Sequence, residues 1–244
     1  MMQQREGGYS FLPGAPGGPF SGGVTALPGY EIVHATLHAM LPWRQAFDLI
    51  ARHLASLGRP LTALCAVELR CPAAYTTEGF AAFNVQYRAL LEQWSLLVDG
   101  YSPAARSNVA PAISPPGEQS LYAFSYTVPS AGNAPPSFVS SGSAERPTVR
   151  PGETSVDALR EKTTDVMAAM QRHLDQLAAT WADVTAVNVY TTNALHAVLE
   201  QGILAPMGTA AGNGVHWFYS RPPVQGLEIE IDLRGIWQEV RLLG

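Results

Sequence analysis

Charged residues are scarce in this sequence. Only 14% of its 244 residues are Asp, Glu, Lys or Arg, whereas 47% are hydrophobic, which is typical of a globular chain with a sizeable core. A surface so poor in charge favours subunit contacts, and we expect a homo-oligomer. The net charge of −5 and the lack of any Lys/Arg run argue against a nucleic-acid partner, because such binding needs a basic surface.

Cysteines and long apolar runs are also scarce. The only cysteines, Cys65 and Cys71, predict neither a disulfide framework nor a metal knuckle, and His34 and His38 lack a third ligand, so no metal site is expected. No apolar run reaches membrane-span length and no signal-peptide region is found, which predicts a cytoplasmic protein without a membrane partner. Neither a phosphate-binding glycine loop nor a nucleophile elbow is present.

The apolar pattern alternates between helical and strand periodicity. Helices are predicted at 43–57, 79–94, 157–177 and 194–204. Strands are predicted at 30–37, 61–69, 107–113, 120–128, 186–191, 215–220 and 227–233. Residues 1–7 are expected to form a disordered tip. This order predicts an α+β fold in which two helices cover one face of a mixed sheet in each half of the chain.

The sequence also repeats itself. Residues 46–70 align with 166–190 without a gap, so that Arg52 falls on Arg172, and Ser21 falls on Ser141 at the same offset. Two segments that share one offset indicate a duplication. We therefore predict a first domain at 1–130, a linker at 131–136 and a second domain at 137–244.

One cation, Arg106, lies among small and apolar neighbours in the stretch 101–116. Its planar donor fork suits a carboxylate that is held bidentately, so Arg106 is predicted to bind an anion. The alternatives are a structural ion pair, or an arginine whose stem packs while its head reaches water.

Carboxylates form a row in the strand predicted at 227–233. Glu228, Glu230 and Asp232 alternate with apolar residues and therefore share one face, which meets water, an interface or a ligand. His216 lies in a nearby apolar stretch. It is either a general acid or base near neutral pH or a histidine hydrogen-bonded within the core or an interface.

Several short motifs occur in an order and spacing that resemble one known family. They are Gly8-Tyr9-Ser10, Ser21-Gly22, the 80–87 segment with Asn84, Ala105-Arg106-Ser107, Pro115-Pro116-Gly117, Ser141-Gly142 and Leu227-Glu228-Ile229-Glu230. The chain resembles the Rid proteins, also called YjgF-like proteins or reactive intermediate deaminases, in tandem. It is more distantly similar to chorismatases. The resemblance implies a chorismate-mutase-like α+β fold for each half and a trimeric assembly with clefts between neighbours.

In that family the cleft hydrolyses enamines or imines without a cofactor. The resemblance implies that Arg106 binds the substrate carboxylate. The residues matched to the opposite wall of the cleft are Tyr9, Ser21, Gly22 and Asn84. Asn108 stands where the family commonly has cysteine, and we count it among the candidate substrate-binding residues.

Each half departs from the family pattern at a different position. The first half has Arg106 but no acid on its last strand, although Glu118 lies in the nearby turn. The second half has Glu228 and Glu230 but no matching arginine. We hypothesise a composite cleft that brings Arg106 together with one of these acids; alternatively, one or both half-sites are degenerate and the acids are solvated.

The leading functional hypothesis is a cofactor-independent hydrolytic deaminase of a small enamine or imine carboxylate, in a specialised pathway. Arg106 would orient the substrate, Glu228 or Glu118 would hold the water, and His216 is a further catalytic candidate. The alternatives are a chorismatase-like or other lyase or hydrolase, and a non-catalytic metabolite-binding or assembly protein.

Overall fold

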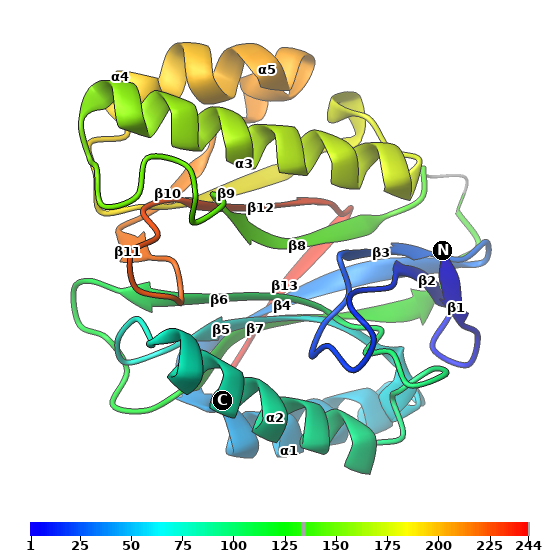
Figure 1. Cartoon of the computed structure of the whole chain (residues 1–244). Coiled ribbons are helices and arrows are strands. Elements are labelled where there is room, and N and C mark those ends of the chain that lie inside the picture. The colour runs from blue at the N-terminus through cyan, green and yellow to red at the C-terminus, as the bar shows by residue number, and fades with distance from the viewer. Residues whose placement is uncertain (133–134, 244) are drawn as a thin grey trace.

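Two β-sheets face each other at the centre of the molecule, and helices cover the outer face of each (Figure 1). The computed structural model describes residues 1–132 and 135–243. Sheet A has the strand order β1 (Met2–Gln4), β2 (Tyr9–Leu12), β3 (Gly23–Ala26), β8 (Phe138–Ala144), β12 (Glu230–Gly235), β9 (Ala186–Tyr190) and β10 (His216–Phe218). Sheet B has the order β11 (Ser220–Arg221), β6 (Ala105–Pro111), β5 (Leu64–Arg70), β7 (Ser120–Pro129), β4 (Tyr30–Pro42) and β13 (Gln238–Leu242).

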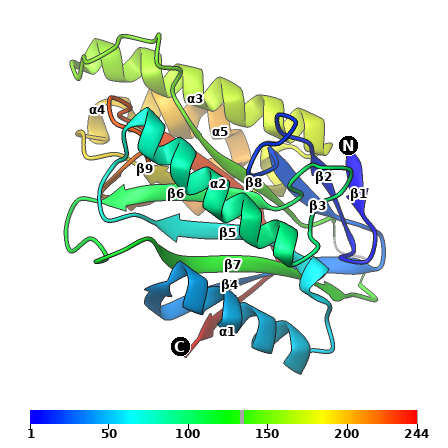
Figure 2. The same cartoon turned by 60° about the horizontal axis from the view of Figure 1, so that its bottom comes forward.

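Both sheets are mixed. In sheet A, β9 and β10 are parallel, and in sheet B the parallel pairs are β5 with β6 and β4 with β13. The helices α1 (Trp43–Ser56) and α2 (Thr77–Gln93) lie side by side on sheet B (Figure 2). Sheet A is covered by α3 (Val156–Leu177) and by α4 (His196–Val198) and α5 (Ala205–Met207), which flank the π-helical turn Leu199–Leu204. The predicted α+β fold, with helices on one face of each mixed sheet, is confirmed.

Local sequence explains where the long helices begin and end. The hydroxyl groups of Thr76 and Ser155 cap the N-termini of α2 and α3 by accepting backbone N–H bonds. Gly58, at a φ of +64°, follows the end of α1. Short 3₁₀ helices also occur at Leu61–Ala63, Trp181–Asp183 and Gly208–Asn213. In the part of the chain that the structure describes, none of the helices has the length and apolarity needed to cross a bilayer.

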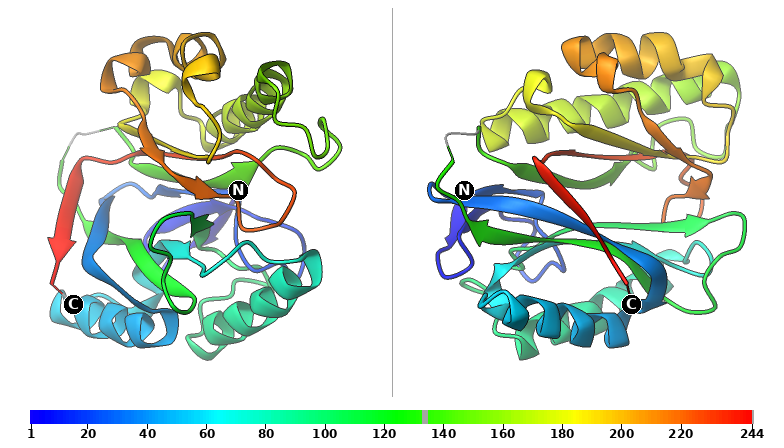
Figure 3. Two further views of the ribbon diagram at one scale, coloured as in Figure 1. Left: turned by 90° about the vertical axis from the view of Figure 1, so that its left-hand side faces the viewer. Right: turned by 180° about the vertical axis from the view of Figure 1, so that it is seen from behind.

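Segments at the two ends of the chain join the sheet of the opposite half. β3 pairs with β8, so the N-terminal strands extend sheet A, while β13 leaves the end of β12 and runs parallel to β4 in sheet B (Figure 3). The expectation of a disordered tip at 1–7 is wrong, because β1 pairs with β2 and the buried Gln4 side chain donates to the Leu96 carbonyl oxygen. The predicted domain limits remain a prediction, and residues 133 and 134 of the predicted linker lie outside the described residues.

The internal repeat is only partly reflected in the fold. α1 and β5 correspond in order to α3 and β9, and β8 precedes α3 as β4 precedes α1. Ser141 lies on β8, which holds in the second half the place that β4 holds in the first. Ser21, the residue aligned with Ser141, lies instead in the segment before β3. The two serines are neighbours instead of equivalents, because Ser141 Oγ donates to the Ser21 carbonyl oxygen at 2.6 Å.

The layer between the sheets is apolar at one end and polar at the other. Strand alternation explains this division for β5, where Val67 and Leu69 face the helices while Glu68 and Arg70 face sheet A. The apolar end contains Tyr9, Phe11, Val24, Ile32 and Ile236. The polar end leads to the candidate site.

Candidate functional site

Arg106 is a buried cation with one unused donor. It lies on β6 and is 3% exposed. Its Nη2 donates to Asn84 Oδ1 on α2 at 2.7 Å, and the rings of Phe20 and Tyr87 lie 4.5 and 4.8 Å from its Cζ, within the range of cation–π attraction. Among the residues that the structure describes, its Nη1 has no hydrogen-bond partner. Burial lowers the pKa of Arg106 to about 10, which leaves the guanidinium charged at neutral pH.

Asn108 presents a second unused donor. It lies two residues further along β6, on the same side of the strand. Its Oδ1 accepts from Gln119 Nε2 at 2.9 Å, and Gln119 Oε1 in turn accepts from the Tyr75 hydroxyl at 2.7 Å. These bonds orient the amide and leave Nδ2 without a partner. Buried donors without partners destabilise a fold, so the two together indicate a place for an anion.

A cavity of about 170 Å³ lies against both donors. Its lining comes from both halves of the chain: Phe20, Phe80, Arg106 and Asn108, then Gly142, Ala144, Pro223, Val224, Leu227 and Glu230. The second-half segment is held in place by Tyr75, whose N–H donates to the Pro223 carbonyl oxygen at 2.7 Å and whose carbonyl oxygen accepts from the Gln225 N–H at 2.9 Å. The volume suits a small molecule, since it lies below the range of drug-sized pockets.

Glu230 brings a carboxyl group to the same cavity. It is the first residue of β12 and is 5% exposed. Burial, and next the charge of Asp232, raise the pKa of Glu230 to about 8, although Arg106 and Arg70 act in the opposite direction. The carboxyl group is therefore mostly protonated at neutral pH and can donate a proton. Gly142 makes room for it, because a Cβ at that position would overlap the Glu230 carboxyl group.

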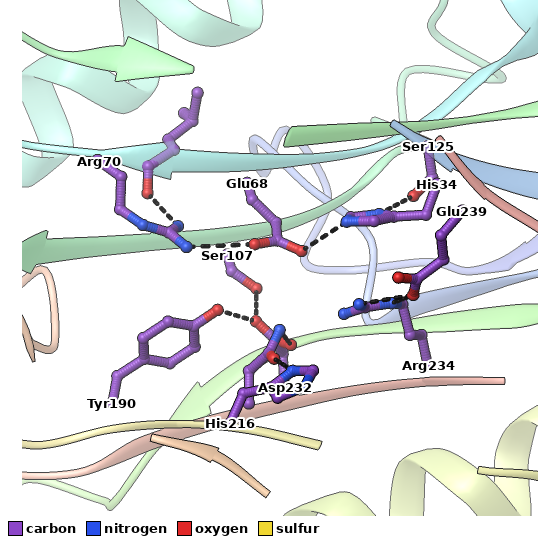
Figure 4. A network of polar contacts seen from close by, with 12 residues as sticks. His34, Glu68, Arg70, Ser107, Ser125, Tyr190, His216, Asp232, Arg234 and Glu239 are labelled. Atoms are coloured by element: carbon purple, nitrogen blue, oxygen red, sulfur yellow. Dashed lines mark hydrogen bonds and ion pairs between the residues drawn. The ribbon is translucent and has the colours of Figure 1, made fainter. Parts of the chain in front are cut away.

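Asp232 follows Glu230 by two residues and therefore lies on the same face of β12. Figure 4 shows Asp232 next to Ser107, Tyr190 and His216. Its carboxylate accepts from Ser107 Oγ at 2.5 Å, the Tyr190 hydroxyl at 2.8 Å and Asn188 Nδ2 at 2.8 Å. Burial raises the pKa of Asp232 to about 6, so it is ionised at neutral pH. Its negative charge favours the protonated form of Glu230.

A second polar group lies further from the cavity, between the two sheets (Figure 4). Glu68 Oε2 is 3.2 Å from Arg70 Nη2, and Glu68 Oε1 is 3.7 Å from His34 Nε2. Burial lowers the pKa of His34 to about 4, and its Nδ1 lies 3.1 Å from Ser125 Oγ. These residues do not line the cavity. Their polar contacts lie within sheet B, and the Arg70 guanidinium reaches sheet A, with its Cζ 5.3 Å from the centre of the Tyr190 ring on β9.

Comparison with known proteins identifies the family of this chain. A sequence profile of the family "2-aminomuconate deaminase CnbZ" matches residues 1–240. The chain belongs to the CnbZ family. A relative in Comamonas testosteroni, 2-amino-5-chloromuconate deaminase, is 38% identical over 247 residues, which cover 97% of this chain and 96% of that protein.

Similarity to solved structures is lower. A chorismatase aligns with a TM-score of 0.46 and 13% identity, covering 88% of this chain and 77% of its own. A YjgF/YER057c/UK114 protein from Mycobacterium tuberculosis aligns with a TM-score of 0.33 and 19% identity, covering 43% of this chain and 82% of its own. A cyanuric acid hydrolase from A. caulinodans has a TM-score of 0.42 and 13% identity, covering 84% of this chain and 66% of its own. The first two belong to the groups that the sequence motifs resemble.

The residues predicted for acid–base chemistry in this CnbZ-family chain lie outside the cavity. Glu228 precedes the start of β12, and its Oε2 accepts from Asn193 Nδ2 at 2.9 Å. Glu118 is exposed in the turn before β7. His216 is exposed on β10, with its Nδ1 3.2 Å from Asn188 Oδ1. Their catalytic roles stay predictions that the geometry does not support.

The predicted substrate-binding residues divide into two groups. Arg106 and Asn108 line the cavity, and Asn84 fixes the guanidinium of Arg106. Tyr9 and Ser21, with its neighbour Gly22, do not line it. The Tyr9 hydroxyl is buried and donates to the Leu64 carbonyl oxygen at 2.9 Å, while the Ser21 N–H donates to the Ala104 carbonyl oxygen at 2.9 Å. These two contacts are internal to the fold.

Glu230, Asp232 and Gly142 are functional candidates that the sequence alone does not single out. The alternating row 228–232 contains both Glu228 and Glu230 without distinguishing them. The start of β12, which separates them, is set by its pairing with β8 and β9. Gly142 stands in a predicted motif, but only the packing of Glu230 against it explains why glycine is needed there.

Proposed function

We propose that this chain hydrolyses the enamine of a 2-aminomuconate-type dicarboxylate, releasing ammonia without a cofactor, in the cavity between Arg106 and Glu230. The observation that carries the proposal is that a buried cation with an unused donor and a protonated carboxyl group line one small cavity. Membership of the CnbZ family supports the reaction class, since a relative is a 2-amino-5-chloromuconate deaminase.

The two unused donors would bind the carboxylate next to the amino-bearing carbon. Arg106 and Asn108 both line the cavity, and within residues 1–132 and 135–243 the Nη1 of Arg106 and the Nδ2 of Asn108 have no hydrogen-bond partner. A charge-assisted pair of hydrogen bonds from these two donors would fix both the position and the orientation of the carboxylate. The rings of Phe20 and Phe80, together with Leu227, would pack against the conjugated hydrocarbon chain. This arrangement places the reacting carbon between the cation and Glu230.

Glu230 would move protons at each step. Its carboxyl group donates a proton to the enamine carbon, which converts the amino-bearing carbon to an iminium. The carboxylate then takes a proton from a water molecule while the water oxygen adds to that carbon. Glu230 next protonates the nitrogen of this adduct and accepts the hydroxyl proton, so that ammonia leaves and a 2-oxo acid remains. The balance is enamine plus water to 2-oxo acid plus ammonia, and Glu230 ends protonated as it began.

We also propose that the chain assembles as a homotrimer in the cytoplasm. The low charge content and the exposed side chains of Trp217, Tyr219 and Trp237 support subunit contacts. Sedimentation equilibrium tests the assembly. The mass of three chains is expected, and the mass of one chain would overturn the proposal.

The decisive experiment measures ammonia release and loss of dienamine absorbance with 2-aminomuconate. Wild-type protein and Glu228→Gln are expected to be active, while Glu230→Gln is expected to lose activity. Glu228→Gln is a matched control, since it makes the same chemical change outside the cavity. Equal activity of the two variants would remove Glu230 from the reaction. Binding of 2-aminomuconate without ammonia release would instead identify a binding protein, and release from 2-aminoacrylate alone would replace the proposed substrate.

A further inference from the structure

Lys162 is the only lysine in the sequence, and it is completely buried. It lies on α3, which covers the outer face of sheet A (Figure 1). A fully buried lysine is rarely found without a partner. Its Nζ is 3.3 Å from Glu145 Oε1, an ion-pair distance, but the angle makes no hydrogen bond. The attraction between the two side chains is therefore mainly electrostatic.

Both carboxylate oxygens of Glu145 accept hydrogen bonds from the backbone that leads into β12. It is 2% exposed and follows β8 directly. Its Oε1 accepts from the Glu228 N–H at 2.8 Å, and its Oε2 accepts from the Ile229 N–H at 3.1 Å. The next residue is Glu230, whose carboxyl group lies in the cavity. Glu145 thus holds the two peptide groups immediately before the proposed acid.

Stability alone does not explain a buried ion pair at this position. Replacing such a pair with apolar residues of similar size is often neutral or stabilising, whereas removing one partner leaves an uncompensated charge. Lys162 lies at ion-pair distance from the carboxyl group of Glu145, whose two oxygens accept the two backbone hydrogen bonds. Neither residue lines the cavity, so any effect on the reaction must act through the backbone of β12.

We propose that Lys162 and Glu145 are positioning residues, which fix the start of β12 and thereby hold the Glu230 carboxyl group against the bound enamine. The functional part of this inference rests on the proposed function. The structural part does not, because it concerns the amides of Glu228 and Ile229 and the environment of Glu230.

The test compares wild-type protein with the double variant Lys162→Met/Glu145→Leu, which removes the pair without leaving one charge alone. Hydrogen exchange at the amides of residues 228 and 229 is expected to accelerate about tenfold or more, because both acceptors are lost. The kcat for 2-aminomuconate is expected to fall by about ten- to a hundredfold, as a displacement of an ångström commonly does. KM is expected to change less than about threefold, because Arg106 and Asn108 are intact.

Two further variants keep the test decisive. Arg160→Met removes an exposed ion pair with Asp157 on the same helix and is expected to change neither exchange nor kcat. If the double variant does not fold, Lys162→Met/Glu145→Gln replaces it, because this variant also leaves neither charge alone. That variant keeps one acceptor, so the amide of either residue 228 or residue 229, but not both, is expected to exchange faster, with a smaller fall in kcat.

Unchanged exchange at residues 228 and 229, or faster exchange with unchanged kcat, would overturn the positioning role. Failure of the proposed function has a different signature, namely no ammonia release by the wild-type protein. In that case the positioning role is decided by amide exchange and by the titration of the Glu230 carboxyl carbon followed by NMR. A titration midpoint that moves in the double variant supports the role, and one that stays in place refutes it.

Discussion

Glu230→Gln should remove most of the pH dependence of stability above neutral pH. Glu230 has a pKa of about 8 in the folded chain against an ordinary value of 4.5. Between these two pH values the folded state holds a proton that the unfolded chain has released, so the free energy of unfolding falls as pH rises. At about 1.4 kcal/mol for each pH unit, the whole interval corresponds to about 5 kcal/mol.

Other buried groups contribute at lower pH. The pKa of Asp232 is raised only to about 6, so the loss of stability that Asp232 causes as pH rises is largely complete near that pH. The pKa of His34 is lowered from 6.5 to about 4, so His34 adds stability as pH rises, and most of this gain is made below pH 6.5. Burial also lowers the pKa of His53 and of His173 from 6.5. Wild-type protein and Glu230→Gln share these histidines, so the difference between the two proteins isolates Glu230, and across the interval from pH 6.5 to 8 it is expected to change by about 2 kcal/mol.

Urea unfolding followed by tryptophan fluorescence at pH 6.5 and 8, at one protein concentration, measures this loss. Wild-type protein and Glu228→Gln should each lose about 2 kcal/mol more across the interval than Glu230→Gln does. Equal changes in wild-type protein and in Glu230→Gln would show that Glu230 is ionised in the folded state. The proposed proton donor would then be refuted, whatever the activity of the variants.

Three further predictions concern the reaction. Arg106→Lys should raise KM about 10- to 100-fold in steady-state assays, because lysine cannot keep both the Asn84 contact and a donor in the cavity; an unchanged KM would exclude carboxylate binding there. In a pH profile, kcat should fall above pH 8 as Glu230 loses its proton, and Asp232→Asn should move this fall to lower pH because the neighbouring negative charge is gone. Gly142→Ala should lower kcat by about tenfold or more and the free energy of unfolding by about 1–3 kcal/mol, since the methyl group displaces the Glu230 carboxyl group; wild-type values in both measurements would contradict the close packing.

The local parts of the fold could be predicted from the sequence. The helix predicted at 43–57 is observed as Trp43–Ser56, and the one at 157–177 as Val156–Leu177. Helical periodicity and caps are properties of neighbouring residues, and they do not depend on the rest of the chain. The position of Arg106 among small and apolar residues likewise indicated an arginine that is not a solvated surface charge, and its side chain is buried; anion binding by Arg106 stays a prediction.

The long-range parts could not be predicted in the same way. The pairing of β3 with β8 and of β13 with β4 joins segments from opposite ends of the chain, and no local pattern encodes it. The same holds for the choice between Glu228 and Glu230, which depends on where β12 begins to pair. One part of the composite-cleft hypothesis agrees with the structure, since Arg106 and Glu230 come from different halves and line one cavity. Which acid lines that cavity could be found only from the register of the sheet.

The burial of Lys162 also determines how the protein surface reacts with carbonyl compounds. Primary amines condense with 2-oxo acids, and the proposed product belongs to that class. The chain has no other lysine, and Lys162 has no exposed surface. The side chains of the folded chain therefore offer no accessible primary amine to a 2-oxo acid. An amine-directed reagent is expected to leave Lys162 unlabelled until the chain unfolds.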